Sequence, residues 1–171
     1  MGLLFQPRWC GDRVTDRADE PDHGVIDRPG TFVAALEAVV LGDAHRFPTL
    51  FTEDVVFRSP HVASESLASM RVAVGSPEDS LSDVTIVVIG LDDLIGKVIG
   101  EWRVEALFTR PVLFDDRLLI EPTGGPVRLP GASVAEFRGD RIKAFRHYFD
   151  DTELLAAVPG APTYLRWSPD H

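Results

Sequence analysis

Three charged residues at alternate positions are the first group in this sequence that could do chemistry. Glu101, Arg103 and Glu105 lie in an apolar stretch that runs from Ile99 to Phe108. Because side chains of an extended strand alternate between two faces, the three charges share one face and the apolar residues between them share the other. Such a row is either a solvated sheet surface or the polar floor of a cavity. In a cavity, the arginine would stabilise developing oxyanion charge beside carboxylates that can move a proton.

A second candidate group is His147, which alternates with Phe145 and Phe149 in the stretch FRHYFD. Histidine donates and accepts protons near neutral pH, so His147 is the candidate general acid–base. The plain alternative is a core histidine packed between two phenylalanines. If Glu105 lies on the same face of a nearby strand, its carboxylate orients His147 and raises the histidine pKa, while Arg103 opposes that shift.

The other titratable candidates carry weaker signals. Asp150 and Asp151 precede Thr152, where they would complement the dipole of a terminal helix, and Asp150 is also a secondary candidate acid. His61 follows Pro60 and is expected on the surface or at a cavity rim. The remaining histidines show no ligand spacing, so the sequence predicts no metal site. It contains neither a Gly-x-Gly-x-x-Gly motif nor a phosphate loop, and no cofactor is expected.

Composition limits the class of protein. The chain has 171 residues, 44% apolar and 26% charged, which suits one folded domain. The formal net charge of −10 argues against nucleic acid and an anionic membrane surface and favours a neutral or weakly charged ligand. The single cysteine, Cys10, excludes an internal disulfide framework and favours a reducing, cytoplasmic location. No run approaches the ~18 apolar residues that a membrane span requires.

Turn signals and hydrophobic periodicity predict helices first, then a run of antiparallel strands, then a short helix, which is an α+β order. Helices are expected between Thr31 and Gly42, at 43–51, more weakly at 62–74, and from Thr152 to Val158. Strands are expected at 55–59, 84–89, 97–109, 117–120, 133–138 and 141–149, with turns at Asp92-Asp93 and Gly139-Asp140. Residues 1–29 are expected to be a flexible extension, 30–158 the folded domain, and 159–171 a tail.

Three segments carry a family resemblance: GDAHRFPTLFTEDVVFRSP at 42–60, EPTGGPVRLPG at 121–131 and FRGDRIKAFRHYFDDTELL at 137–155. Together they resemble the SnoaL-like branch of the nuclear-transport-factor-2-like superfamily over about residues 31–158. The resemblance implies a cone-shaped α+β barrel, in which a curved, mostly antiparallel sheet wraps around the N-terminal helices and encloses a deep cavity. It also implies homodimers that form through the convex face of the sheet.

The resemblance bears on the faces of the central strand. It implies that Arg103 and Glu105 point into the cavity and that Trp102 and Phe108 lie on the convex, dimer-forming side. The limonene-epoxide-hydrolase branch has Arg-x-Asp on this strand and a second aspartate where this sequence has His147. That departure weakens water activation by an Asp–Arg–Asp triad and leaves proton transfer by histidine intact.

The sequence therefore predicts a cofactor-independent acid–base enzyme that acts on a bulky, apolar polyketide- or terpenoid-like metabolite. The reaction would be cyclisation, isomerisation or intramolecular epoxide opening. The alternatives are a non-catalytic binding or assembly module and, further away, an epoxide hydrolase. Candidate catalytic residues are His147, Glu105, Arg103 and Asp150. Candidate substrate-binding residues are Glu101, Phe145, Phe149, Phe57 and His61.

Overall fold

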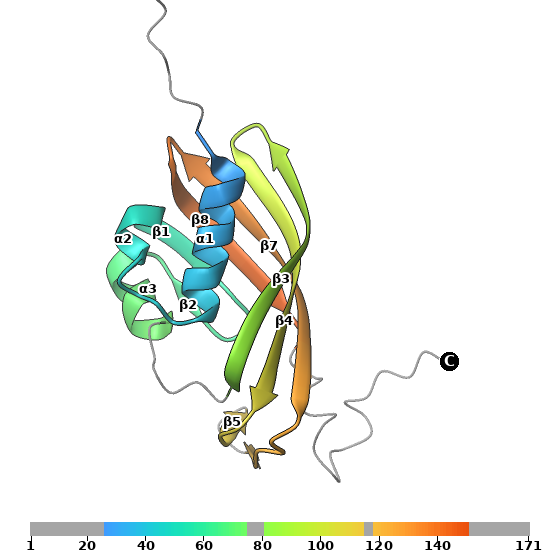
Figure 1. Ribbon diagram of the computed structural model, residues 1–171. Coiled ribbons are helices and arrows are strands. Elements are labelled where there is room, and N and C mark those ends of the chain that lie inside the picture. Colours follow the sequence, from blue (N-terminus) through green and yellow to red (C-terminus); the bar gives the residue numbers. More distant parts are fainter. Residues whose placement is uncertain (1–25, 75–80, 115–117, 151–171) are drawn as a thin grey trace, which may run out of the picture.

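The computed structural model describes residues 26–74, 81–114 and 118–150 (Figure 1). The helices are α1 (Arg28–Val40), α2 (Phe47–Leu50) and α3 (Leu67–Val74). The strands are β1 (Phe51–Arg58), β2 (Ala63–Ser64), β3 (Leu81–Leu94), β4 (Lys97–Phe108), β5 (Val112–Phe114), β6 (Leu118–Ile120), β7 (Pro126–Arg138) and β8 (Arg141–Phe149). Within these ranges, no helix has the length and apolar character needed to cross a membrane.

Six of the strands form one curved sheet in the order β2-β1-β8-β7-β4-β3, and β5 pairs with β6 alone. Strand β1 runs parallel to β8, whereas the other neighbours are antiparallel, so the sheet is mixed. All three helices lie on one side of the sheet, with α1 along the long strands (Figure 1). The α+β cone-like fold predicted from the sequence is confirmed.

Helix α1 begins earlier than the sequence analysis predicted. Asp27, not Thr31, is the N-cap: its Oδ1 accepts a hydrogen bond from the Gly30 backbone N–H at 2.8 Å. A carboxylate at this position satisfies one of the free amide groups of the first turn. The Thr31 hydroxyl instead donates to the Asp27 carbonyl. The predicted end at Gly42 is confirmed, because Gly42 has a φ of 63°.

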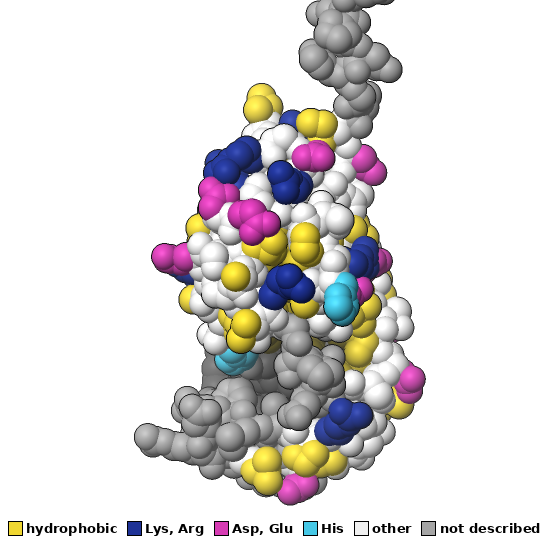
Figure 2. All heavy atoms as spheres, turned by 90° about the vertical axis from the view of Figure 1, so that its left-hand side faces the viewer, with side chains coloured by type: hydrophobic (Ala, Val, Ile, Leu, Met, Phe, Trp, Pro, Cys, Tyr) yellow, Lys and Arg dark blue, Asp and Glu magenta, His cyan; other side chains and the backbone are white. Residues whose placement is uncertain are grey.

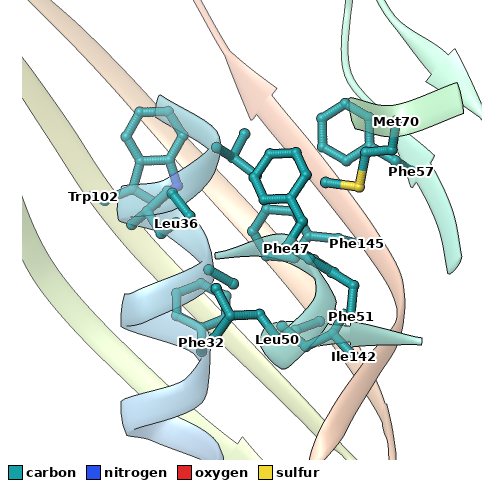
Figure 3. Close-up of a cluster of buried hydrophobic side chains, with 14 of the residues drawn as sticks. Phe32, Leu36, Phe47, Leu50, Phe51, Phe57, Met70, Trp102, Ile142 and Phe145 are labelled. Atoms are coloured by element: carbon teal, nitrogen blue, oxygen red, sulfur yellow. The ribbon is translucent and has the colours of Figure 1, made fainter. Parts of the chain in front are cut away.

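The hydrophobic core lies between α1 and the inner face of the sheet, the face that the helices cover. Phe32 and Leu36 of α1 are fully buried, and Figure 3 draws both in the cluster of buried side chains that also contains Trp102. Phe32 sits directly over Gly100, where an added Cβ would collide with its ring. The position of Phe32 therefore requires glycine at residue 100 of β4.

The long strands differ from their predicted extents. Strand β3 begins at Leu81 and continues through Asp92 and Asp93, which pair with β4, and the chain turns at Ile95-Gly96, where Gly96 has a φ of 71°. Strand β7 begins at Pro126 rather than near residue 133. The tight turn at Gly139-Asp140 is confirmed, with Gly139 at a φ of 64°.

The two faces of β4 are opposite to those that the family resemblance implied. Trp102, Val104, Ala106 and Phe108 are buried in the core, each at most 7% exposed. Glu101, Arg103 and Glu105 lie on the outer face of the sheet. The predicted placement is therefore wrong, and the plain alternative, a charged outer row backed by a core row, describes the strand.

Some predicted segments lie outside the described residues. Residues 1–25 of the predicted extension belong to this group. The extension was predicted to end at residue 29, but α1 already begins at Arg28, so the folded domain starts slightly earlier. The helix predicted between Thr152 and Val158 and the tail at 159–171 also lie outside the description.

Candidate functional site

An apolar cavity of about 260 Å³ lies between the helices and the inner face of the sheet. Helices α1 and α3, strand β1 and the inner faces of β3, β4, β7 and β8 supply its walls. The polar side chains on these walls, besides the Trp102 indole, are Ser59, His61 and His147. None of the described lining residues is Asp, Glu, Lys or Arg, so this part of the site suits an uncharged, mainly apolar ligand.

His147 lies on β8 at the sheet side of this cavity and is only 5% exposed. Its ring stacks on the Trp102 indole with centroids 4.7 Å apart and planes 11° from parallel. The rings of Phe145 and Phe149 lie 6.0 and 5.4 Å away on the same strand. The alternation predicted from FRHYFD therefore holds, and it places one imidazole among aromatic rings at the cavity wall.

A short chain of hydrogen bonds connects three adjacent strands behind the His147 ring. The Trp102 indole N–H on β4 donates to Ser133 Oγ on β7 at 2.9 Å, and Ser133 Oγ is 2.9 Å from His147 Nδ1 on β8. Ser133 is directly opposite His147 in the β7–β8 register and is fully buried. The other ring nitrogen, Nε2, has no hydrogen-bond partner among the described residues.

Burial lowers the pKa of His147 from 6.5 to about 4. The cause is loss of solvation, which penalises the charged imidazolium. The sequence analysis expected the opposite direction, with Glu105 raising this pKa. That expectation is wrong because no described carboxylate faces the ring. At neutral pH the imidazole is therefore uncharged, a hydrogen-bonding group rather than a cation.

Arg103 and Glu105 form an ion pair, but on the outer face of the sheet and away from the cavity. Their Nη2 and Oε1 atoms are 2.8 Å apart, and their side chains are 37% and 38% exposed. Arg128 of β7 lies 3.7 Å from the same carboxylate oxygen. The predicted convergence of Arg103, Glu105 and His147 is therefore wrong. The strand period separates the residues, since Trp102 and Val104 occupy the inner positions between them.

Two further predicted residues, Glu101 and Asp150, also lie away from the cavity. Both are exposed and line a separate hollow of about 590 Å³ with Tyr148 of β8 and Ala132 of β7. The Asp150 backbone N–H donates to the Pro130 carbonyl at 3.2 Å. Neither carboxylate faces His147, so the structure does not bring them into the candidate site.

The predicted apolar contacts agree better with the structure. Phe57, Phe149 and His61 line the cavity. His61 is exposed at the rim, with its ring centroid 5.8 Å from that of Phe149. Phe145 does not line the cavity, because it is fully buried between Phe32, Phe51 and Phe57 in the core.

Sequence analysis missed Ser133 and the role of Trp102. Ser133 was only the start of a predicted strand, and Trp102 was assigned to the outer face. The available signal was the plain alternative for β4, with Trp102 facing inward, combined with the β7–β8 hairpin. Together these would have placed Trp102, Ser133 and His147 on one face. The described residues contain no cluster of three or more potential metal ligands.

The site is an apolar cavity between the helices and the sheet of an α+β cone, an arrangement that suits a small molecule. Comparison with known proteins identifies the family that shares this fold. The chain belongs to the SnoaL-like domain family, whose match covers residues 32–145. The resemblance inferred from the sequence is therefore confirmed. Comparison with curated protein sequences gave no match.

Solved structures share the fold at low sequence identity. A candidate SnoaL-like polyketide cyclase from Jannaschia sp. CCS1 is 14% identical, with a TM-score of 0.62 over 83% of this chain and 99% of that one. A Catenulispora acidiphila protein with a ketosteroid isomerase-like fold, solved with trimethylamine, is 17% identical, with a TM-score of 0.60 over 82% and 98%. An epoxide hydrolase of the LEH-like type from M. tuberculosis is 13% identical, with a TM-score of 0.55 over 75% and 86%.

Proposed function

We propose that this protein is a cofactor-independent enzyme that cyclises or isomerises an uncharged, mainly apolar metabolite of polyketide or terpenoid type. The observation that carries the proposal is His147, a hydrogen-bonded imidazole at the wall of a mainly apolar cavity. Membership of the SnoaL-like family and the similarity to a candidate polyketide cyclase support the reaction class.

His147 is the proposed catalytic residue. The transition states for cyclisation and isomerisation of a carbonyl compound carry developing negative charge on the carbonyl oxygen. A hydrogen-bond donor in a water-poor cavity stabilises that charge more strongly than the same donor in water. The Nε2 side of the ring has no described protein partner, so it is the side available to a ligand.

The test uses turnover of a native metabolite extract, followed by mass spectrometry. We expect conversion of one compound by the wild type and a loss of ~10²–10³-fold in rate for His147→Phe, which has no N–H to donate. Glu105→Gln is the matched control, since it changes one titratable side chain on the opposite face of the sheet and should keep the wild-type rate. Full turnover by His147→Phe would remove His147 from the mechanism.

A non-catalytic binding module is the second candidate function. It is favoured by one specific observation: the described cavity walls carry no carboxylate that could serve as a base beside the neutral imidazole. The same extract separates the two candidates. A compound that is recovered unchanged from the protein supports binding alone, whereas a converted compound supports the enzyme.

Epoxide hydrolysis loses its support. That alternative depended on Arg103 and an acid acting with a second polar residue in the cavity, and Arg103 and Glu105 lie on the outer face. The fold similarity to an epoxide hydrolase gives no residues for water activation in this chain.

Two finer expectations stay proposals. The homodimer was argued from an exposed Trp102 row, which instead lies in the core, so any dimer would use other outer-face residues, such as Ile99 and Val134. Sedimentation at micromolar concentration tests it, and a monomer would reject it. A cytoplasmic location still rests on the single cysteine, Cys10.

A further inference from the structure

We propose that Ser133 and Trp102 hold His147 in the Nε2–H form, so that the cavity offers a ligand a hydrogen-bond donor and selects an uncharged molecule with an acceptor oxygen. Ser133 and Trp102 are then positioning residues, and His147 is the group that touches the ligand. The consequence for catalysis rests on the proposed function, whereas the tautomer of His147 follows from the hydrogen bonds alone.

The direction of the hydrogen bonds follows from the first donor. An indole nitrogen can only donate, so Ser133 Oγ must accept at its 2.9 Å contact with Trp102 Nε1. The Ser133 hydroxyl hydrogen is then free for the second contact, 2.9 Å from His147 Nδ1. An Nδ1 that accepts this hydrogen carries no proton itself. In the neutral ring, the proton must be on Nε2.

The opposite tautomer leaves a polar group unsatisfied. If Nδ1 carried the proton, Ser133 Oγ would accept from both His147 and Trp102, and its own hydrogen would need another acceptor. Ser133 is fully buried, and among the described residues its side chain hydrogen-bonds to these two rings alone. A buried hydroxyl without an acceptor is costly, so the indole sets the tautomer through the serine.

The backbone supports this arrangement. Trp102 is opposite Gly131 in the β4–β7 register, and an added Cβ on Gly131 would collide with the six-membered ring of the indole. The indole therefore lies across Gly131 and reaches Ser133, two residues along β7. A larger residue at position 131 would displace the first donor of the chain.

In the described part of the chain, no charged side chain lines the cavity beside the His147 ring. The strands packed around His147 present Trp102, Ser133, Phe145 and Phe149 to it, and the other titratable group that lines the cavity is His61. A neutral donor in such surroundings attracts a carbonyl, ether or epoxide oxygen. It gives no comparable attraction to a cation, and an anion would lose its solvation without a counter-charge.

The first experiment reads the tautomer directly. Long-range ¹H–¹⁵N correlation spectra of protein with ¹⁵N-labelled histidine distinguish protonated from unprotonated ring nitrogens. At pH 7 we expect unprotonated Nδ1 and protonated Nε2 for His147 in the wild type. Ser133→Ala should give a mixture of tautomers and move the His147 pKa upward, because the donor that favours the neutral ring has gone.

A second variant and a matched control protect this test against simple misfolding. Trp102→Phe frees Ser133 Oγ to accept from Nδ1–H, so it should also give a mixture. Ser82→Ala removes a hydroxyl from β3 outside the cavity and should leave the His147 spectrum unchanged. A wild-type Nδ1–H tautomer, or a tautomer that Ser133→Ala leaves unmoved, would overturn the proposal.

The second experiment tests ligand choice with two defined probes, 1-tetralone and tetralin, which differ by one carbonyl oxygen. One neutral hydrogen bond corresponds to about a fivefold preference for the ketone in the dissociation constant. His147→Phe should abolish the preference. Equal binding of both probes by the wild type would reject an acceptor-selective site. Neither readout requires turnover, so a protein that binds without catalysis would still give both expected results.

Discussion

The same sheet carries two polar groups on opposite faces, only one residue apart along β4. On the inner face, Trp102, Ser133 and His147 form an uncharged chain that is at most 5% exposed. On the outer face, Arg103 and Glu105 form an ion pair whose side chains are more than a third exposed. Both groups have good hydrogen-bond geometry, and the property in which they differ is their exposure to solvent.

The difference shows that the charged residues of β4 do not mark the cavity of this fold, whose described lining is uncharged. Solvent screens the outer pair, and such pairs typically contribute ~0–1 kcal/mol. The inner chain has lost its solvation, so a missing partner there costs more and the pKa of its histidine falls to about 4. The proposed catalytic residue therefore belongs to the uncharged group. The outer surface over the helices likewise mixes acidic and basic side chains rather than gathering one sign (Figure 2).

The largest predicted effect is a loss of stability on acidification. His147 has a pKa of about 4 in the folded protein and an ordinary value of 6.5 when exposed. Between these values the unfolded chain binds a proton that the folded chain does not, so the free energy of unfolding falls as the pH drops from about 6.5 to 4. The full loss is about 3 kcal/mol.

Urea unfolding at pH 7 and pH 4.5 measures this effect. His147→Gln cannot titrate, so its free energy of unfolding should change less with pH than that of the wild type, by about 2–3 kcal/mol across this interval. Other groups titrate equally in both proteins, which makes the difference specific to His147. Parallel pH profiles for the two proteins would contradict the buried, neutral ring.

The next effect is steric and concerns the position of Trp102. Gly131→Ala would place a methyl group against the indole and 2.6 Å from the Tyr148 carbonyl oxygen, which belongs to the backbone and cannot easily move. We expect a loss of ~1–3 kcal/mol in the free energy of unfolding. Gly90→Ala on β3 is the matched control, because nothing lies within 4 Å of its added Cβ. Equal stability of the two variants would show that the indole does not need Gly131.

The smallest effect is expected on the outer face. Glu105→Gln breaks the ion pair with Arg103 and should change the free energy of unfolding by no more than ~1 kcal/mol, with a smaller change at high salt. It should leave the His147 resonances and their pKa unmoved, because the two side chains lie on opposite faces of the sheet. A shift of the His147 pKa in this variant would show that Glu105 influences the ring across the sheet, and would contradict the separation of the two groups.

Much of the fold could be predicted from the sequence because its signals are local. The stop at Gly42 and the turn at Gly139 follow from glycine's access to positive φ, and the alternation around His147 follows from the strand period. The start of α1 was misplaced because Asp27 and Thr31 are both good caps, and only the observed hydrogen bond decides between them.

The sequence by itself determined that Arg103 and Glu105 share one face of a strand and that Trp102 and Val104 share the other, because alternation is a property of any strand. It could not determine which face points inward. That choice depends on the packing of α1 over Gly100 and on the burial of the indole against Gly131, contacts between residues far apart in the chain. Tertiary structure alone placed Ser133 between Trp102 and His147, since three separate strands supply the three side chains.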